Sequence, residues 1–399
     1  MKVTIVGGGF GGVKTALVLA KQRNMQVTLI SDRPDFQYYP ALYGAATGHS
    51  KRQAWIPLGE IFGDVRNVQV YIDTITSIDK DAKELTASSG KVYEYDHCVL
   101  ALGSVTTYFG IKGLDEFAHG IKSAEEITRL KEHLYTQMGE QRTIDKNYVI
   151  IGGGPTGVEL AATLGSYLER LRVYYKLPQS KIRVTLVEAS PRLLPRMSET
   201  TSRRVKKRLE KLGVKIETNK VVQSENADTL MVSDRPIKSQ TVIWTSGVAN
   251  NPFYKANEQQ FEFSKNGKIV VDEYMRAGKN LYVIGDNAFT PYSGLAQIAL
   301  HDAQFVADNL IRHQEQRTLR AYHAVMPPVV VPVGENWAAF EWRKLRLYGY
   351  LASLLRRAAD VIGYSDILPL GHALNVFQSQ EVVANDYFTP PTVRKVRKK

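Results

Sequence analysis

The 399-residue sequence predicts an α/β protein with two similar halves, followed by a basic, amphipathic C-terminal region. Two observations predict the halves. A strand, a glycine-rich turn and a helix occur at the N-terminus and again from residue 148. An apolar strand that ends in a glycine turn then follows each copy, roughly ninety residues later. The composition, 44% hydrophobic and 23% charged, is that of a globular protein of two or three domains and excludes a disordered, collagen-like or coiled-coil chain.

The first half opens with a β-branched strand at residues 3–6, and a helix follows its glycine turn. Gly7, Gly9 and Gly12 fit the pattern Gly-x-Gly-x-x-Gly: the first glycine permits the turn, the second lets the backbone approach a pyrophosphate, and the third lets helix pack on strand. The phosphate then lies at the helix N-terminus. A second strand at residues 26–30 ends at Ser31 and Asp32, where a ribose-binding acid is expected. This context predicts a dinucleotide-binding unit of the Rossmann type.

The second half repeats the pattern after residues 148–151, with Gly152, Gly154 and Gly157 in the three glycine places. Its next strand, residues 182–187, ends at Glu188. A carboxylate there favours the ribose 2′-hydroxyl of NADH over a 2′-phosphate, although the nearby Arg192 complicates that choice. One such turn alone could bind nothing, but two copies in strand context argue against that alternative. Two dinucleotide sites in one chain indicate an electron relay between two cofactors.

The remaining strands suggest that one domain is inserted into another. Residues 95–103 and 240–247 are corresponding apolar strands of the two halves, and a later strand at 280–288 contains Gly285 and Asp286. The first domain is therefore expected to resume after the second. The predicted segments are a first cofactor domain at 1–112 and 265–326, an inserted domain at 113–264 with a linker at 113–145, and a C-terminal region at 327–399.

The single cysteine, Cys98, limits the chemistry available to the protein. A dithiol/disulfide centre and a cysteine zinc site each need at least two thiols. Cys98 lies within an apolar strand, where a buried small hydrophobe is expected. The motifs His-Glu-x-x-His and Gly-x-Ser-x-Gly are absent from the sequence. We therefore predict no metal site, no catalytic thiol and no hydrolase activity.

Further motifs complete a family resemblance. They are the aromatic segment 36–43 with its continuation to Gly48, and Ala296-Gln297-Ile298-Ala299. With the fingerprints and strands above, the chain resembles the flavoproteins with two dinucleotide-binding domains, and within them the type II NADH dehydrogenases, which are single-subunit NADH:quinone oxidoreductases. The resemblance covers roughly residues 1–325.

The resemblance implies FAD at the N-terminal fingerprint, with the Asp286 carboxylate accepting a hydrogen bond from a ribityl hydroxyl, and NADH at the second. The implied FAD-binding residues are Gly7, Gly9, Phe10, Gly11, Gly12, Ser31, Asp32, Pro40, Thr47, Ile75, Ala101, Gly103, Gly285, Asp286, Ala296 and Gln297. The implied NADH-binding residues are Gly152, Gly154, Pro155, Thr156, Gly157, Glu188 and Gly247.

Three residues are implied in catalysis. Glu159, placed in the first turn of the second helix, is expected near flavin and nicotinamide, where it would manage protons; the alternative is a carboxylate that only stabilises a helix N-terminus. Gln297 is expected beside the quinone pocket. The family signature Ala-Gln-x-Ala-x-Gln has its second glutamine replaced by His301, which either relays a proton or is a tolerated polar substitute.

Two further positions depart from the family pattern. Ser31 occupies the usual place of the ribose-binding acid, and Asp32 follows it. Leu102 stands where many relatives have threonine, so a side-chain hydrogen bond would be lost there.

The C-terminal region concentrates positive charge. From Arg343 onward there are ten Lys or Arg and four acids, which is half of the chain's net charge of +12. Residues 348–362 are expected to form a helix, with Leu347, Leu351, Leu354, Leu355, Ala358 and Ile362 spaced for one apolar face. Such a segment, with a second apolar stretch at 367–377 and the basic residues 394–399, suits an anionic membrane surface. The alternative is that the helix packs on the flavin domain or a dimer mate, and that the basic end is a solvated tail.

The leading hypothesis is a FAD-dependent, non-proton-pumping NADH:quinone oxidoreductase. With no signal or transit peptide and no apolar run long enough to span a bilayer, it is expected to be a peripheral membrane protein on the cytoplasmic face. Its expected partners are NADH, a quinone and the anionic membrane surface; a homodimer stays open and nucleic acid is not expected. The alternatives are a soluble flavin reductase acting on ferredoxin, rubredoxin or oxygen, and a non-enzymatic flavoprotein scaffold or redox sensor. Base-stacking aromatics are not evident around residues 394–399, which weakens the last.

Overall fold

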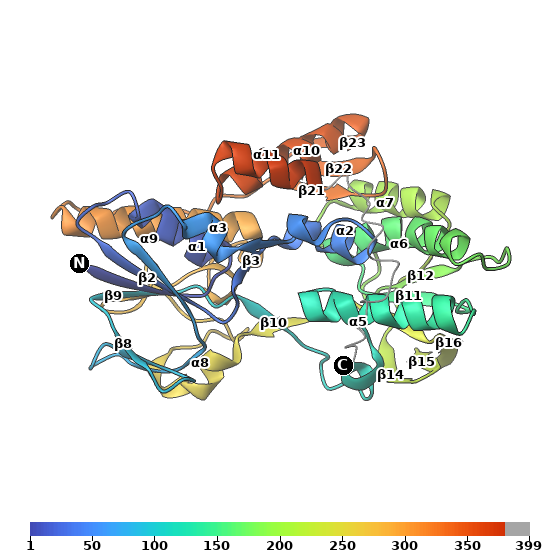
Figure 1. The fold of residues 1–399 in the computed structure, drawn as a ribbon, viewed down its shortest axis with the longest axis horizontal. Helices are drawn as coiled ribbons and strands as arrows, with labels where there is room; N and C mark the ends of the chain where they lie inside the picture. Colours follow the sequence, from blue (N-terminus) through green and yellow to red (C-terminus); the bar gives the residue numbers. More distant parts are fainter. Residues whose placement is uncertain (380–399) are drawn as a thin grey trace, which may run out of the picture.

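The computed structural model describes residues 1–379 and contains two parallel sheets side by side, with the C-terminal region lying across both halves (Figure 1). The predictions on residues 380–399, among them the basic stretch 394–399, lie outside the described residues. The predicted α/β class with two Rossmann-like units is confirmed. The predicted domain boundaries stay a prediction.

The first sheet has six strands in the order β19-β20-β9-β1-β2-β5. All neighbouring pairs are parallel except β19 with β20. Its strands are β1 (Lys2–Val6), β2 (Gln26–Ser31), β5 (Val68–Ile72), β9 (His97–Leu100), β19 (Arg276–Gly278) and β20 (Leu281–Val283). Buried residues run almost continuously along β1, β9 and β20, as expected for strands covered on both faces. Cys98 lies in β9 as a fully buried side chain.

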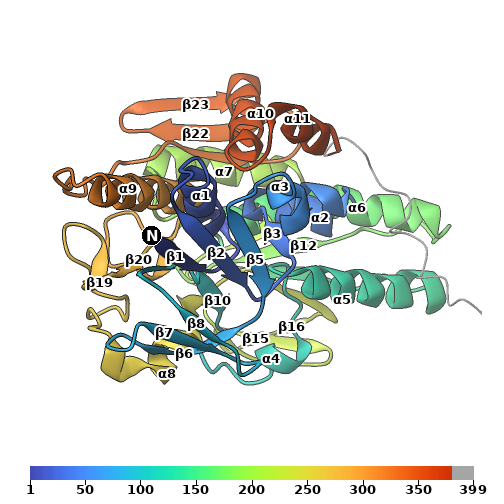
Figure 2. The ribbon, with the colours of Figure 1, turned by 60° about the vertical axis from the view of Figure 1, so that its left-hand side comes forward.

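Two helices cover one face of this sheet. They are α1 (Phe10–Leu19), which follows the first glycine turn, and α9 (Ala296–Gln314), which packs beside α1. An antiparallel sheet lies on the opposite side (Figure 2), made of β6 (Ile75–Asp79), β7 (Glu84–Ala87) and β8 (Val92–Glu94). The helix α8 (Pro252–Ala256) packs against β6.

The second sheet has four parallel strands in the order β13-β12-β11-β17. They are β11 (Tyr148–Ile151), β12 (Val184–Val187), β13 (Val214–Glu217) and β17 (Thr241–Trp244). The helices α6 (Pro155–Tyr174) and α7 (Glu199–Lys211) pack on it. An antiparallel sheet of β14 (Val222–Asn226), β15 (Thr229–Val232) and β16 (Arg235–Lys238) accompanies it. Each half therefore combines a parallel sheet with a three-stranded antiparallel one.

Two connections link the halves. The short strands β10 (Ser104–Thr106) and β18 (Val248–Asn250) pair as an antiparallel ribbon between them. The segment after β3 (Asp35–Gln37) forms a 3₁₀ turn, Tyr39–Ala41, and the helix α2 (Leu42–Ala46), which packs against α6 and against α5 (Ala124–Leu134) of the other half. The remaining short elements are β4 (Trp55–Pro57), α3 (Leu58–Phe62), α4 (Leu114–Phe117), a π-helical turn (Tyr135–Glu140) and 3₁₀ turns at Lys51–Gln53, Glu258–Gln260 and Gly285–Asn287.

The C-terminal unit begins with an antiparallel sheet and ends with two helices. Its elements are β21 (Val329–Pro332), β22 (Ala338–Trp342), β23 (Leu345–Gly349), α10 (Tyr350–Ser365) and α11 (Leu370–Gln378). The helix predicted over 348–362 therefore begins at Tyr350, and Leu347 belongs to β23, where it pairs with Phe340. The expectation that Leu347 lies on the helical face was wrong, because backbone pairing with β22 keeps this residue extended.

The helix α10 places its apolar side chains outward. Leu351, Leu354, Leu355 and Ile362 are exposed, and Leu370 and Leu374 of α11 are exposed as well. The residues that α10 buries include Ala352, Asp360 and Tyr364. The apolar face therefore does not pack on the first half of the chain, which was one of the two alternatives for this helix. The other alternative, packing on a dimer mate, stays open. Among residues 1–379, no helix is long and apolar enough to cross a membrane.

Candidate functional site

The glycines of the first fingerprint have different surroundings. A Cβ on Gly7, whose φ is +114°, would lie 2.3 Å from the Ala101 carbonyl oxygen, and a Cβ on Gly12 would lie 1.8 Å from the Gly7 carbonyl oxygen. A Cβ on Gly9 would meet no atom within 4 Å. Gly9 is the N-cap of α1 and has no side-chain cap. The turn therefore leaves open space beside uncapped backbone N–H groups, which fits a pyrophosphate.

The second fingerprint reproduces this arrangement. A Cβ on Gly157 would lie 1.8 Å from the Gly152 carbonyl oxygen, and Gly152 has a φ of +116°. A Cβ on Gly154 would meet nothing within 4 Å, and Gly154 caps α6 without a side-chain hydrogen bond. Pro155 occupies the start of α6, where its missing N–H costs nothing. The two halves therefore present two similar cradles for a dinucleotide phosphate.

The acids that follow the second strand of each half differ. The Glu188 carboxylate accepts hydrogen bonds from the backbone N–H of Gly153 at 2.5 Å and of Ser190 at 2.7 Å, so it lies against the second fingerprint. In the first half, the Ser31 hydroxyl donates to the Arg33 carbonyl at 2.7 Å. Asp32 is exposed, with an ion pair to Arg33 at 3.8 Å. The carboxylate is thus fixed at the turn in the second half only.

Arg192 is bonded to carbonyl groups of its own loop. Its guanidinium donates to the carbonyl oxygens of Pro195 at 2.6 Å, Met197 at 2.7 Å and Leu194 at 3.3 Å. These three bonds hold the arginine within its own loop. The Arg192 guanidinium is therefore less available to bind the 2′-phosphate of NADPH.

Asp286 lies in the 3₁₀ turn after β20, where the second part of the chain returns to the first sheet. Its carboxylate accepts a hydrogen bond from the Ser104 hydroxyl at 2.7 Å. The backbone N–H of Gly285 donates to Asp302 at 3.0 Å, and Tyr322 donates to the same carboxylate at 2.7 Å. Burial raises the pKa of Asp302. Sequence reasoning missed Ser104 and Asp302, because their partners lie far along the chain; Asp302 could have been noticed as an acid five residues after Gln297 in the same helix.

Gln297 and His301 lie on the same side of α9, four residues apart. Gln297 is exposed in the first turn of the helix. The His301 Nε2 is 3.0 Å from the His323 carbonyl oxygen, and the ring lies 5.5 Å from that of Tyr322. His301 thus contacts the segment that follows α9. This contact does not distinguish a proton relay from the alternative, in which His301 only substitutes for the family's glutamine. Its role in proton relay stays a prediction.

The other predicted residues surround these turns. Phe10 packs edge-on against Phe36 at 4.9 Å, and the Thr47 carbonyl oxygen accepts a bond from Arg170 of α6 at 3.1 Å. The Gly247 carbonyl accepts a bond from Lys122 at 3.1 Å. The remaining positions are Gly11 in α1, Ile75 at the start of β6, Ala101 and Gly103 after β9, Thr156 in α6 and Ala296 at the start of α9. Burial raises the pKa of the Cys98 thiol, which fits the absence of a predicted thiol role.

Glu159 lies in the second turn of α6, which begins at Pro155; its placement in the first turn was wrong. The side chain is buried, with a residue exposure of 8%, so a helix-terminus role does not account for it. Its Oε1 lies 3.9 Å from Nη1 of Arg356 in α10. Burial raises the pKa of Glu159 to about 8, with Arg356 opposing the rise and Asp360 adding to it. The sequence alone placed neither Arg356 nor Asp360 at this site.

Arg356 connects Glu159 to two other segments. Its Nε lies 3.0 Å from Oδ2 of Asp360, and its Nη2 donates to the Pro40 carbonyl at 2.8 Å. The Tyr38 hydroxyl donates to Asp360 at 3.1 Å. We call these residues, Glu159, Arg356, Asp360, Tyr38 and the Pro40 carbonyl, the Glu159 cluster. It joins the first half, the second half and the C-terminal helix at one point.

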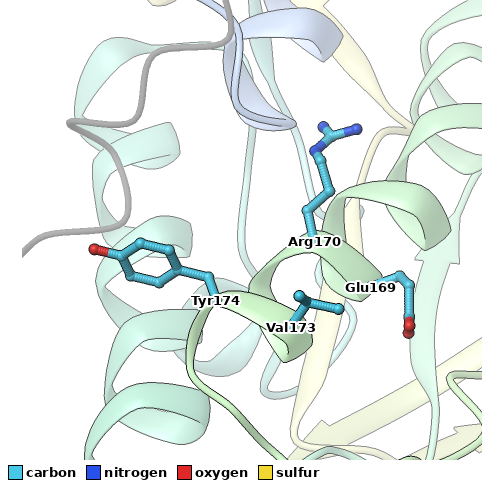
Figure 3. A pocket seen from close by; sticks show the side chains of 4 residues that line it. All are labelled: Glu169, Arg170, Val173 and Tyr174. Atoms are coloured by element: carbon cyan, nitrogen blue, oxygen red, sulfur yellow. The ribbon is translucent and has the colours of Figure 1, made fainter.

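A separate pocket lies at the other end of α6. Figure 3 shows its four lining side chains, Glu169, Arg170, Val173 and Tyr174. The volume of the pocket is about 340 Å³. Glu169 is paired with Arg172, and Arg170 donates to Thr47. The pocket is about ten residues, or roughly 15 Å, beyond Glu159 along the helix. We assign it no role in the nucleotide site.

The two glycine cradles, one on each parallel sheet, define a protein with two Rossmann-like units. Residues 1–303 match the family model of the pyridine nucleotide-disulphide oxidoreductases. The type II NADH:quinone oxidoreductase of Staphylococcus saprophyticus is 30% identical over 358 residues, covering 84% of this chain and 88% of its own length. The type II NADH:quinone oxidoreductase NdhA of Mycobacterium tuberculosis is 27% identical over 396 residues, covering 91% of this chain and 84% of its own length.

A solved structure shares the fold. The NDH2 of Plasmodium falciparum, determined in complex with NADH, superposes with a TM-score of 0.82 at 17% identity and covers 95% of this chain and 97% of its own. The chain belongs to the pyridine nucleotide-disulphide oxidoreductase family and, within it, to the type II NADH:quinone oxidoreductases. A pyridine nucleotide and a flavin are therefore its cofactors.

Proposed function

We propose that this chain oxidises NADH and reduces a membrane quinone, with FAD as its flavin and without pumping protons. The observation that carries the proposal is the pair of open glycine cradles, Gly9 on the first sheet and Gly154 on the second. The first cradle and the Asp286 turn would hold FAD, because a pyrophosphate fits an uncapped helix N-terminus. The second cradle and Glu188 would hold NADH. Family membership supports this division of the two sites.

When bound, the flavin would accept the hydride of NADH and supply two electrons to the acceptor. The protein's residues provide binding, orientation and a proton. Glu188 engages the second fingerprint and disfavours a 2′-phosphate by charge repulsion. Glu159, held in a buried site, is the group suited to give a proton to the quinone.

The outward face of α10 and α11 supports a membrane partner. We call the exposed side chains Tyr350, Leu351, Leu354, Leu355, Ile362, Leu370 and Leu374 the apolar surface. Large exposed apolar patches mark interaction sites, and a helix with such a face lies in the plane of a membrane interface. A quinone with a long isoprenoid tail dissolves in the bilayer. The apolar surface would therefore hold the enzyme at the cytoplasmic face of the membrane, where the quinone lies. In a homodimer formed through the same side chains, the apolar surface would lie on the dimer axis instead.

The test begins with the cofactor that the purified protein releases on denaturation. Chromatography is expected to identify FAD, and recovery of FMN alone would contradict the proposal. Steady-state assays then compare NADH with NADPH, and a quinone with ferredoxin and with oxygen. We expect a preference for NADH and for quinone; a preference for ferredoxin or oxygen would favour a soluble flavin reductase.

A further inference from the structure

The inward face of α10 carries a charged pair toward the site, while the outward face carries the apolar surface. Arg356 is nearly buried, with 12% of its side chain exposed, and Asp360 is 9% exposed. Their contacts reach α6 through Glu159, the 3₁₀ turn through the Pro40 carbonyl, and the preceding residue Tyr38 through its hydroxyl. Burying an ion costs desolvation free energy unless the ion is paired, so the contacts of Arg356 and Asp360 must compensate for their burial.

The Glu159 cluster contains one cation and two carboxyls. The Arg356 Nε lies 3.0 Å from Asp360 and its Nη2 bonds the Pro40 carbonyl, whereas its Nη1 lies 3.9 Å from Glu159. A single positive charge balances a single carboxylate, and a second carboxylate in the same buried site would be uncompensated. The shorter contact assigns that charge to Asp360. Glu159 is then the carboxyl that keeps its proton.

Arginine cannot be the proton donor at this site, because a guanidinium does not deprotonate in proteins. Burial opposes the positive charge of Arg356, but its neighbours, Asp360 foremost, leave its pKa above the ordinary value. The titratable and charged groups that face Glu159 are Arg356 and Asp360 from α10 and Tyr43 from α2. Burial raises the pKa of Tyr43 and of Tyr38, so both phenols stay protonated. Burial also raises the pKa of Asp360, while Arg356 and the Tyr38 hydroxyl lower it. Because the guanidinium lies closer to Asp360, at 3.0 Å against 3.9 Å, Glu159 is the carboxyl of the cluster that holds and gives up the proton.

We propose that Asp360 is a positioning residue for proton transfer from Glu159: with Tyr38 it holds Arg356 away from Glu159, and so keeps Glu159 protonated for the quinone. The inference rests on the proposed function. The hydride of NADH brings two electrons and one proton, whereas conversion of a quinone to a quinol takes two electrons and two protons. The Glu159 O–H bond breaks and an O–H bond forms on the quinone oxygen. The Glu159 carboxylate then recovers a proton from water.

The arrangement makes the C-terminal helix part of the reaction site. Asp360 lies far from Glu159 in the chain and acts on it in two ways, through its own negative charge and through Arg356, four residues earlier on the same helix. Loss of the Asp360 charge removes the negative neighbour that raises the pKa of Glu159 and frees Arg356 to pair with Glu159 instead. Both effects lower the pKa of Glu159. The proton would then be lost at a lower pH.

The experiment uses the full-length holoprotein and three variants. Asp360→Asn removes the charge, and Tyr38→Phe removes only the hydroxyl that bonds Asp360. Asp366→Asn is the matched control, because it breaks a 2.7 Å ion pair with Lys14 that also docks α10 but does not touch the Glu159 cluster. Flavin absorbance and thermal midpoint establish that each variant is folded. Tyr38→Phe keeps the test decisive if Asp360→Asn does not fold.

Two measurements follow each protein over pH. Infrared difference spectroscopy, referenced to Glu159→Gln, follows the protonated carboxyl of Glu159 without turnover. Stopped-flow kinetics then measure reoxidation of the NADH-reduced protein by a short-chain quinone. We expect Asp360→Asn to lower both midpoints by about one unit or more, which is the usual effect of one nearby charge. Tyr38→Phe should shift them less in the same direction, and Asp366→Asn should not shift them.

Unchanged midpoints in folded Asp360→Asn would overturn the proposal. If Asp360→Asn does not fold, unchanged midpoints in Tyr38→Phe would do the same. An equal shift in Asp366→Asn would also overturn it, because that result would indicate a general loosening of α10. Failure of the native protein to reduce quinone would overturn the proposed function instead. In that case the infrared titration still decides whether Asp360 sets the protonation of Glu159.

Discussion

At the residue scale, each fingerprint contains glycines that the fold requires and glycines that leave space for a ligand. Gly12 and Gly157 are needed for the fold itself, since a Cβ on either would lie 1.8 Å from a carbonyl oxygen. Gly9 and Gly154 face open space, so their lack of a side chain matters only when something else approaches. The two kinds of glycine can therefore be separated by substitution.

Gly9→Ala is expected to lower flavin retention with little effect on the stability of the flavin-free protein, because its Cβ would meet no protein atom within 4 Å but would occupy the phosphate cradle. Gly12→Ala should lose flavin and also about 1–3 kcal/mol of stability through overpacking. Flavin absorbance per protein and thermal unfolding measure both effects. Gly59→Ala, a helical glycine whose Cβ would also be free of contacts, is the control. Normal flavin content in Gly9→Ala would contradict the assignment.

Glu159 makes stability depend on pH. Burial raises its pKa to about 8 in the folded protein from an ordinary value of 4.5, so between these values the unfolded chain loses the proton that the folded one keeps. The contribution of Glu159 to stability therefore falls as pH rises through this window. Glu159→Gln cannot ionise, so its thermal midpoint relative to the native protein should rise between about pH 4.5 and 8 and then level off. A difference that does not change with pH would show that the carboxyl titrates normally.

Single residues were predictable where the signal is local in the chain. The two fingerprints and Glu188 are read from consecutive residues, and the structure places Glu188 against Gly153. The partners of Glu159 were not predictable, because Arg356 reaches it only after the C-terminal helix has docked. The same holds for Ser104 with Asp286. Tertiary contacts of this kind leave no periodicity in the sequence.

At the scale of elements, α10 is amphipathic in the reverse sense of an ordinary surface helix. Its charged residues Arg356 and Asp360 face the protein, and its leucines face outward. The spacing of the leucines predicted a helix with an apolar face, which the structure contains with a later start. Which way this face points could not be read from spacing, because it depends on the buried partners of the opposite face.

Leu351→Glu is expected to weaken binding to vesicles that contain anionic lipid by about tenfold or more, since inserting one leucine is worth about 1.5–3 kcal/mol. Co-sedimentation with such vesicles measures the loss. Val221→Glu is the control, because Val221 is similarly exposed but lies in the second half of the chain, outside the apolar surface. Equal vesicle binding by native protein and Leu351→Glu would remove α10 from the membrane contact.

The strand β22 fastens the C-terminal unit to α7. The Glu341 carboxylate accepts bonds from the Ser198 N–H at 3.0 Å and from the Ser198 and Thr201 hydroxyls at 2.6 Å, at the N-terminus of that helix. Burial alone would raise the pKa of Glu341, but these bonds bring it below its usual value.

Glu341→Ala should cost about 2 kcal/mol, the usual loss for hydrogen bonds to a charged group. Chemical denaturation measures it, with Glu335→Ala, an exposed glutamate of the same unit, as the reference. An equal stability of the two variants would show that the hydrogen bonds of Glu341 do not stabilise the protein.

At the scale of the whole molecule, the C-terminal unit crosses both halves (Figure 1). Two similar sheets were predictable because strand, glycine turn and helix repeat in the sequence. The bridging position of the unit was not, because it follows from two separate contacts, Arg356 with Glu159 and Glu341 with Ser198. The apolar surface and the two nucleotide cradles are thereby held in one structure, as an enzyme that takes one substrate from water and another from the membrane would require.

Anaerobic stopped-flow mixing in two steps tests the relay most directly. The purified yellow protein is mixed first with NADH, and then with a quinone, with oxidised ferredoxin or with oxygenated buffer. We predict that NADH bleaches the flavin absorbance and that the quinone restores it faster than ferredoxin or oxygen does. A flavin that NADH does not bleach, or that ferredoxin or oxygen reoxidises while quinone does not, would contradict the proposed reaction.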